Sequence, residues 1–191
     1  MKKHSAVIGI LVSLLPIGQP LMIETAFTLT SAAVMLAVPE KAQAESADFY
    51  FERAYKKGTE GDYYGAISDY TKVIEINPRY SKAYTNRGYS KNELKNYQGA
   101  IVDFNKAIQI NPNDSLAYYN RSRSYYYLGD YYGAISDSTK TIELNSKDKK
   151  AYAIRGMSKE EIGDMKGACF DWRKASSLGY EDAAKWVRNQ C

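Results

Sequence analysis

A nine-residue string, GDYYGAISD, occurs twice in this sequence, and its recurrence constrains the fold more than any other feature. The copies begin at Gly61 and Gly129, 68 residues apart (129 − 61), and a looser version, KNYQGAIVD, begins midway at Lys95. The period is therefore 34 residues (68/2). Periods of about 20–50 residues are typical of repeat arrays, in which each unit buries its apolar face against its neighbours.

Extending the period divides almost everything after residue 46 into four blocks, with a short remainder. The blocks are residues 47–80, 81–114, 115–148 and 149–182, and residues 183–191 form a C-terminal cap. A turn signal lies mid-block, Gly-Asp in three blocks and Lys-Asn in the second, and Asn-Pro ends the first two blocks. Each block is therefore predicted to be a hairpin of two helices.

Recurring columns indicate how the two helices pack. Small residues recur where helices would cross closely, and larger apolar residues recur at helical spacing around them. The small columns are Ala54, Gly88, Ser122, Gly156 and Ala66, Ala100, Ala134, Ala168. The large columns are Tyr50, Tyr84, Tyr118, Tyr152 and Tyr70, Phe104, Trp172, with Ser138 interrupting the second.

A 34-residue helix pair with small residues at the crossing and proline near its end resembles the tetratricopeptide repeat, and the resemblance covers residues 47–182. Ser146 replaces the proline in block three, and Leu178-Gly179-Tyr180 departs from the pattern in block four. The resemblance implies an all-α solenoid, a right-handed superhelix whose first helices line a concave, peptide-binding groove. With a capping helix from Glu181 to Gln190, we expect nine helices and no sheet.

Projection of the first helices places eleven residues on the inner surface of this groove. They are Phe51, Tyr55, Asn86, Tyr89, Tyr119, Asn120, Arg123, Tyr126, Tyr127, Ile154 and Met157. Tyrosine rings supply apolar contact at small entropic cost, and amide and guanidinium groups can hydrogen-bond a peptide. Tyr119 and Arg123 do not follow the packing register, so replacing both is expected to weaken binding and leave the melting temperature nearly unchanged.

The tetratricopeptide family also has a two-carboxylate clamp that grips a terminal carboxylate. Only Asn120 and Lys150 match its positions here. The mismatch argues against binding of a chaperone tail.

Charged residues recur in register as well. Arginines recur at Arg53, Arg87, Arg121 and Arg155, and aspartates recur 16 residues later at Asp69, Asp103, Asp137 and Asp171. This separation can bring each pair face to face across a hairpin. We interpret the pairs as structural clamps, because an unpaired, partly buried charge is costly. A ligand-binding arginine ladder is the alternative.

No constellation of residues supports catalysis. The only histidine, His4, precedes the repeats, and the chain has no phosphate-binding GxxxxGK[ST] loop. Neighbouring carboxylates such as Glu160 and Glu161 are most simply interpreted as part of a solvated helix face. We therefore expect no enzyme activity, no cofactor and no metal. The 26 basic and 22 acidic residues are interleaved along the chain, which argues against nucleic acid as a partner.

Cys169 and Cys191 are the only cysteines. Two cysteines without histidine do not make a metal site, so a disulfide that fastens the cap helix is the better functional interpretation. The alternative is one buried thiol and one thiol at a frayed terminus.

Residues 1–44 are predicted to be an export leader. The start is basic, an apolar run extends from Ala6 to Leu15, and Ala42-Gln43-Ala44 suits cleavage before Glu45. The leader exceeds the usual signal-peptide length of about 15–30 residues, which leaves an uncleaved membrane anchor as the alternative. In both cases we expect the repeats outside the cytoplasm, in a periplasm, a lumen or the extracellular space.

Two functions of different classes fit these observations. The first is an exported scaffold that binds a peptide segment of a protein partner during assembly of an envelope or membrane complex. The second is a repeat protein that binds cell-wall carbohydrate, because exposed tyrosines can stack on sugar rings. A hydrolase with unrecognised catalytic groups is a third, against which the absence of histidine from the repeats counts.

Overall fold

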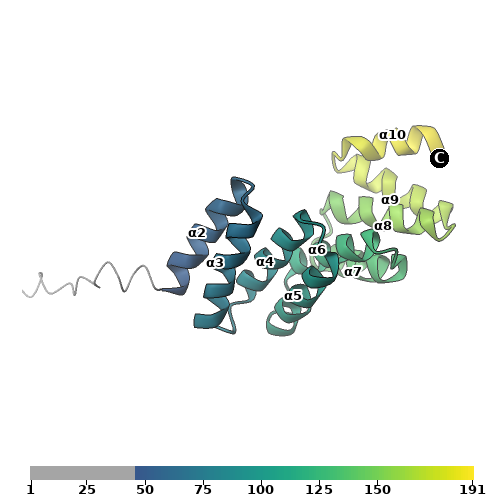
Figure 1. The fold of residues 1–191 in the computed structure, drawn as a ribbon. Helices are drawn as coiled ribbons and strands as arrows, with labels where there is room; N and C mark the ends of the chain where they lie inside the picture. Colours follow the sequence, from purple (N-terminus) through teal and green to yellow (C-terminus); the bar gives the residue numbers. More distant parts are fainter. Residues whose placement is uncertain (1–45) are drawn as a thin grey trace, which may run out of the picture. The chain divides into compact units, whose positions relative to one another are not determined.

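The computed structural model describes residues 46–191, so the predicted leader and its cleavage site lie outside the described residues. Over this range the chain forms nine helices and no strand, as the repeat pattern predicts (Figure 1). The helices are α2 (Ala47–Thr59), α3 (Tyr63–Ile76), α4 (Ser81–Glu93), α5 (Tyr97–Ile110), α6 (Ser115–Tyr127), α7 (Tyr131–Leu144), α8 (Lys149–Glu161), α9 (Met165–Ser177) and α10 (Glu181–Gln190). None of them combines the length and the apolar character that crossing a membrane requires.

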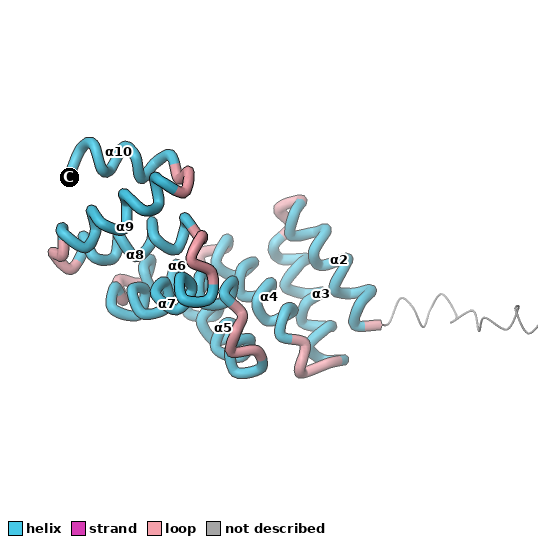
Figure 2. The backbone as a smooth tube through the Cα atoms, turned by 180° about the vertical axis from the view of Figure 1, so that it is seen from behind, coloured by secondary structure: helices cyan, strands magenta, loops and turns pink. Residues whose placement is uncertain are grey.

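The helices pack as four successive hairpins followed by α10 (Figure 2). The second helix of each hairpin also packs on the first helix of the next. In addition, α4 contacts α2 and α6, and α6 contacts α8, whereas successive second helices contact one another less. The first helices therefore lie closer together and line the inner side of the array.

A side-chain cap begins the second helix of every hairpin. The caps Asp62, Asn96, Asp130 and Asp164 accept hydrogen bonds from the backbone N–H groups of Gly65, Gly99, Gly133 and Gly167. The residue before each cap has a positive φ, 84° at Gly61, 79° at Gly129, 83° at Gly163 and 60° at Lys95. Glycine adopts this conformation without steric cost, so Lys95 strains the second turn.

The helix crossings confirm the pairing of small with large residues in two hairpins. A Cβ added to Gly88 would lie 2.7 Å from Phe104 Cε1, and one added to Gly156 would lie 2.5 Å from Trp172 Nε1. In the third hairpin Ser122 and Ser138 are both fully buried, and their hydroxyls donate to carbonyls of their own helices. The crossing of the third hairpin is therefore polar.

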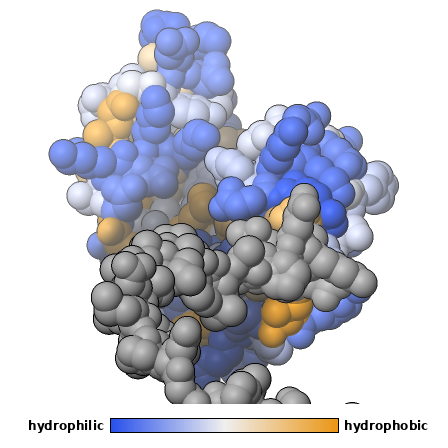
Figure 3. Space-filling model, turned by 90° about the vertical axis from the view of Figure 1, so that its left-hand side faces the viewer, coloured by the Kyte–Doolittle hydropathy of each residue, from blue (hydrophilic) through white to orange (hydrophobic). Residues whose placement is uncertain are grey.

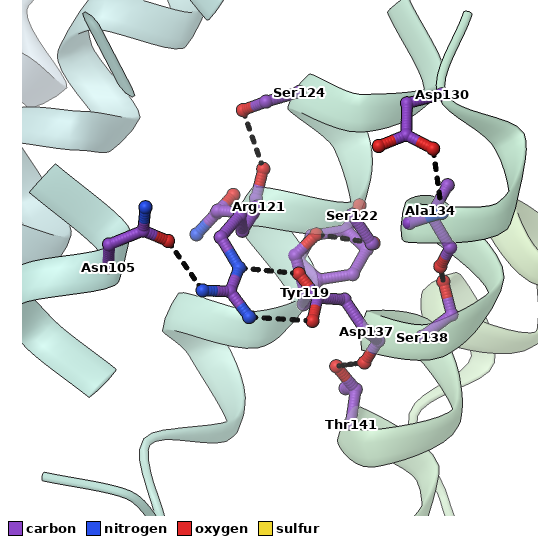
Figure 4. Close-up of polar contacts among 12 residues, drawn as sticks. Asn105, Tyr119, Arg121, Ser122, Ser124, Asp130, Ala134, Asp137, Ser138 and Thr141 are labelled. Atoms are coloured by element: carbon purple, nitrogen blue, oxygen red, sulfur yellow. Dashed lines mark hydrogen bonds and ion pairs between the residues drawn. The ribbon is translucent and has the colours of Figure 1, made fainter. Parts of the chain in front are cut away.

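The arginine of each recurring pair links the two helices of its hairpin, and three of the four arginines also reach a third helix. Its Nε and one terminal nitrogen donate to the two carboxylate oxygens of its aspartate, at 2.6–3.0 Å, and these aspartates are at most 5 % exposed. In hairpins two to four the other terminal nitrogen reaches the preceding hairpin, at Thr71, Asn105 and Thr139 (Figure 4 shows Asn105, Arg121 and Asp137). The arginines are thus occupied in joining helices within and between hairpins.

A lysine joins three of these four pairs. Lys57, Lys91 and Lys159 lie 2.7–2.9 Å from Asp69, Asp103 and Asp171. Tyr125 occupies the equivalent position in the third hairpin. Burial raises the pKa of Asp137, although the hydrogen bond from Arg121 opposes the shift. In the first hairpin the hydrogen bond from Arg53 lowers the pKa of Asp69.

A disulfide joins the last hairpin to the end of the chain. It links Cys169 of α9 with Cys191, which follows α10. Ala183 of α10 is fully buried, and Trp186 and Val187 pack half-buried against the core of the last hairpin. The C-terminal residues therefore cover the end of the array.

Candidate functional site

A cavity of about 840 Å³ lies along the inner side of the array, and we call it the groove. Its lining residues come from the first helices α2, α4, α6 and α8, with contributions from α3 and from the turn before α10. The volume falls within the range of about 300–1,000 Å³ that is typical of ligand sites.

Nine of the eleven residues predicted for the inner surface line the groove. They are Tyr55, Asn86, Tyr89, Tyr119, Asn120, Arg123, Tyr127, Ile154 and Met157. All nine belong to first helices, since the helical period and the repeat register together place them on the inner side.

The predictions for Phe51 and Tyr126 are wrong. The Phe51 ring packs in the first hairpin, 5.6 Å from the Tyr70 ring and 5.1 Å from the Tyr80 ring between centroids. The Tyr126 ring turns toward α7 and lies 5.8 Å from the Tyr131 ring. Both side chains sit on the face of the first helix that meets a second helix, so they are used in packing.

Sequence reasoning missed several other residues of the groove. Leu116 belongs to the same column of the repeat as Lys150, which the comparison with the family's clamp singles out, so the register could have identified it. Tyr63 recurs in register with Tyr97 and Tyr131 at the start of the second helices, and it lines the groove as well. Tyr180 lies where the fourth block departs from the repeat, and no pattern in the sequence indicates its position.

The aliphatic side chains of the groove gather at one end. Between α2 and α4 the lining carries hydroxyl, amide and carboxylate groups, including Tyr89, Asn86 and Glu93. Between α6 and α8 it carries the apolar side chains Leu116, Ala153, Ile154 and Met157 beside the polar groups of Tyr119, Asn120 and Lys150. A bound segment can therefore place an apolar side chain at the α6–α8 end and polar groups at the other.

Arg123 lies between these two ends and is paired. Its two terminal nitrogens each lie 3.3 Å from Glu93 Oε1, and the two side chains are 23 % and 25 % exposed. The pair connects the second hairpin with the third. Arg123 is therefore part of the packing, contrary to the expectation that its replacement leaves the melting temperature nearly unchanged.

Asn120 is only 2 % exposed and its amide serves the fold. The side-chain Nδ2 of Asn120 donates to the backbone carbonyl of Leu116, and the backbone carbonyl of Asn120 accepts from Asn92 Nδ2. Asn92 Oδ1 in turn accepts from Ser124. This buried network fixes α4 against α6, so Asn120 positions the floor of the groove as well as lining it.

The tyrosines of the groove divide into buried and exposed rings. Tyr70 is 2 % exposed and Tyr119 is half-buried, and burial raises the pKa of both hydroxyl groups to about 12. Tyr55, Tyr89 and Tyr127 are 55 %, 39 % and 54 % exposed. These three rings at the rim are available to a ligand without rearrangement of the core.

Two smaller cavities, of about 470 Å³ beside Arg87 and about 310 Å³ beside Asn113, also lie among the described residues. No group of three or more His, Cys, Asp or Glu residues in the described part of the chain could hold a metal ion. On the face drawn in Figure 3, hydrophilic residues predominate and hydrophobic ones form small separate patches. The groove is therefore the site on which a functional proposal can rest.

The sequence matches three models of the tetratricopeptide repeat, at residues 47–80, 81–114 and 104–136. No curated protein shows significant similarity to the chain.

Several solved structures share the fold. The crystal structure of MamA protein is 24 % identical, with a TM-score of 0.69 over 75 % of this chain and 80 % of that chain. The first tetratricopeptide domain of Spaghetti (RPAP3), solved with the HSP90 peptide SRMEEVD, is 25 % identical, with a TM-score of 0.61 over 63 % of this chain and 95 % of that chain. The Arabidopsis OM64 tetratricopeptide domain is 24 % identical, with a TM-score of 0.60 over 62 % and 98 %.

Proposed function

The chain belongs to the tetratricopeptide repeat family, and we propose that it is a non-enzymatic scaffold that holds a peptide segment of a partner protein in the groove. The observation that carries the proposal is the groove itself, with exposed tyrosine rings at its rim and aliphatic side chains gathered at its α6–α8 end. Tyrosine-rich surfaces bind peptides well because the rings are large and lose little conformational entropy.

The fold relative Spaghetti (RPAP3) supports peptide binding as the mode, because its first domain was solved with the HSP90 peptide SRMEEVD. The chemistry of the segment differs here. Of the family's carboxylate clamp only Asn120 and Lys150 are present, and Ile154 adds an apolar surface. We propose that the segment carries an apolar side chain toward α8.

The leader pattern extends this proposal to a cellular setting. A basic start, an apolar run and small residues before Glu45 favour export, so the partner would belong to an envelope or membrane complex. Mass measurement of the protein from its native cell tests export. A chain that starts at Glu45 supports cleavage, and a full-length chain in the membrane supports the anchor.

Two matched double variants test the groove. Tyr89→Ala with Tyr127→Ala removes two exposed rings from the rim, whereas Tyr64→Ala with Tyr132→Ala removes two rings that are 77 % and 74 % exposed on second helices. In pull-downs from envelope extract, and in selection of a random dodecapeptide library on phage, only the rim variant should lose its partners.

Equal recovery with both variants would show that the groove is not the binding site. A parallel assay on purified wall polymer distinguishes the carbohydrate alternative. Loss of polymer binding in the rim variant, with no peptide selected, would replace the peptide proposal by a carbohydrate-binding one.

A further inference from the structure

The turn before α10 brings a residue of the C-terminal cap into the groove. Tyr180 lines the groove together with Lys150 and Ala153 of α8 and Tyr119 of α6. The C-terminal segment therefore supplies a wall of the site at its α8 end.

The position of Tyr180 depends on how α10 is held. The Trp186 ring lies 5.9 Å from the Tyr180 ring and 5.6 Å from the Trp172 ring of α9. Lys149 Nζ donates to the carbonyl of Gly179 at 2.9 Å, which ties the turn to α8. Tyr180 is thus fixed from one side by α8 and from the other by α10.

Few side chains of α10 are fully buried. The helix has ten residues, begins without a side-chain cap and buries only Ala183 completely. Isolated helices shorter than about 12–15 residues are marginal in water. The disulfide between Cys169 and Cys191 spans 22 positions and links the far end of α10 to α9. It restricts the freedom of the segment that carries Tyr180.

We infer that the disulfide-linked cap is part of the binding site, with Tyr180 as a positioning residue for the bound segment, and that reduction of the disulfide weakens binding in the groove. The inference rests on the proposed function. Reduction requires a dithiol reductant, which supplies two electrons and becomes a disulfide itself. Cys169 and Cys191 each gain a proton as the S–S bond breaks, and α10 loses its covalent link to α9.

Hydrogen exchange of the full chain tests the placement of the cap without a ligand. Reduction, or the double variant Cys169→Ala with Cys191→Ser, should accelerate exchange in residues 181–190 and leave the first two hairpins unchanged. Unchanged exchange in residues 181–190 would overturn the inference, because it would show that the disulfide does not hold the helix.

Fluorescence anisotropy tests binding, with the most frequently selected dodecapeptide synthesised and labelled with fluorescein as the probe. Reduction and Tyr180→Ala should each weaken binding by about twofold to tenfold, the range expected for loss of one aromatic contact. Tyr180→Phe keeps the ring and should bind within twofold of the wild type, and Tyr64→Ala is the control for loss of a distant tyrosine.

Unaltered affinity in both the reduced protein and Tyr180→Ala would overturn the role of the cap. Failure of the phage selection to yield any peptide that depends on Tyr89 and Tyr127 would instead overturn the proposed function. Hydrogen exchange still decides the placement of the cap in that case, so the two failures are distinguishable.

Discussion

Both terminal nitrogens of Arg123 in α6 lie 3.3 Å from Oε1 of Glu93 in α4, so one ion pair connects two hairpins inside the groove. The residues are 30 positions apart in the chain. Because each side chain is about three-quarters buried, removal of one charge leaves the other partly desolvated.

We expect Arg123→Ala to lower the free energy of unfolding by about 1–3 kcal/mol, measured by urea denaturation. Adding Glu93→Gln removes the carboxylate that Arg123→Ala leaves unpaired. The loss of unfolding free energy in the double variant should therefore be smaller than the sum of the losses in the two single variants. Strict additivity would mean that the two groups do not interact, and the groove would then keep Arg123 free for a ligand.

The arginine pairs should differ in their contribution to stability. Arg121 is the cation paired with Asp137, whereas Lys57 remains beside Asp69 when Arg53 is removed. The Arg121 side chain is also 17 % exposed, against 44 % for Arg53. Arg121→Ala should therefore cost about 3–5 kcal/mol of unfolding free energy, and Arg53→Ala clearly less. Equal urea midpoints for the two variants would contradict this ranking.

Acid should destabilise the first hairpin through Asp69. The hydrogen bond from Arg53 lowers the pKa of Asp69 below its ordinary value of 3.8, so its stabilising contribution is present above that value and is lost as the pH falls through the lower, folded-state pKa. We expect the difference in urea midpoint between pH 5 and pH 3 to be smaller in Asp69→Asn than in the wild type.

Asp137→Asn is the matched control for this pH dependence. Burial raises the pKa of Asp137, so its protonation in acid favours the folded state, and stability from this group is lost as the pH rises through the folded-state pKa. Asp137→Asn should therefore not reduce the difference in urea midpoint between pH 5 and pH 3. If the difference in urea midpoint between pH 5 and pH 3 were smaller in Asp137→Asn than in Asp69→Asn, the acid sensitivity would come from Asp137 and not from Asp69.

The strained turn at Lys95 offers a stabilising substitution. Lys95 has a φ of 60°, where Gly61, Gly129 and Gly163 stand in the other hairpins. Lys95→Gly should raise the free energy of unfolding by about 1 kcal/mol, because a side chain in the left-handed region costs about 1–2 kcal/mol and glycine loses part of this gain through its entropy. Gly129→Lys is the reverse change and should lower it by a similar amount. Thermal unfolding of both variants checks the pair.

The 34-residue period by itself determined the number of hairpins, their turns and the identity of the inner helices. This is possible because helical periodicity, caps such as Asp62 and left-handed glycines such as Gly61 act within a few residues of one another. The recurring spacing of 16 residues likewise anticipated the pairing of Arg53 with Asp69, since both lie in one hairpin.

Contacts between hairpins were decided only by the tertiary structure. Periodicity identifies residues that share a face, but the angle at which hairpins stack selects the part of that face which is covered. Packing within a hairpin has the same effect: Phe51 packs on Tyr70 and Tyr80, while Tyr55, one turn later on the same helix, is exposed in the groove. Tyr180 lines the groove together with Tyr119, 61 positions earlier in the chain (180 − 119), because α10 folds back on α9. Its segment lies outside the repeat register that relates the four hairpins.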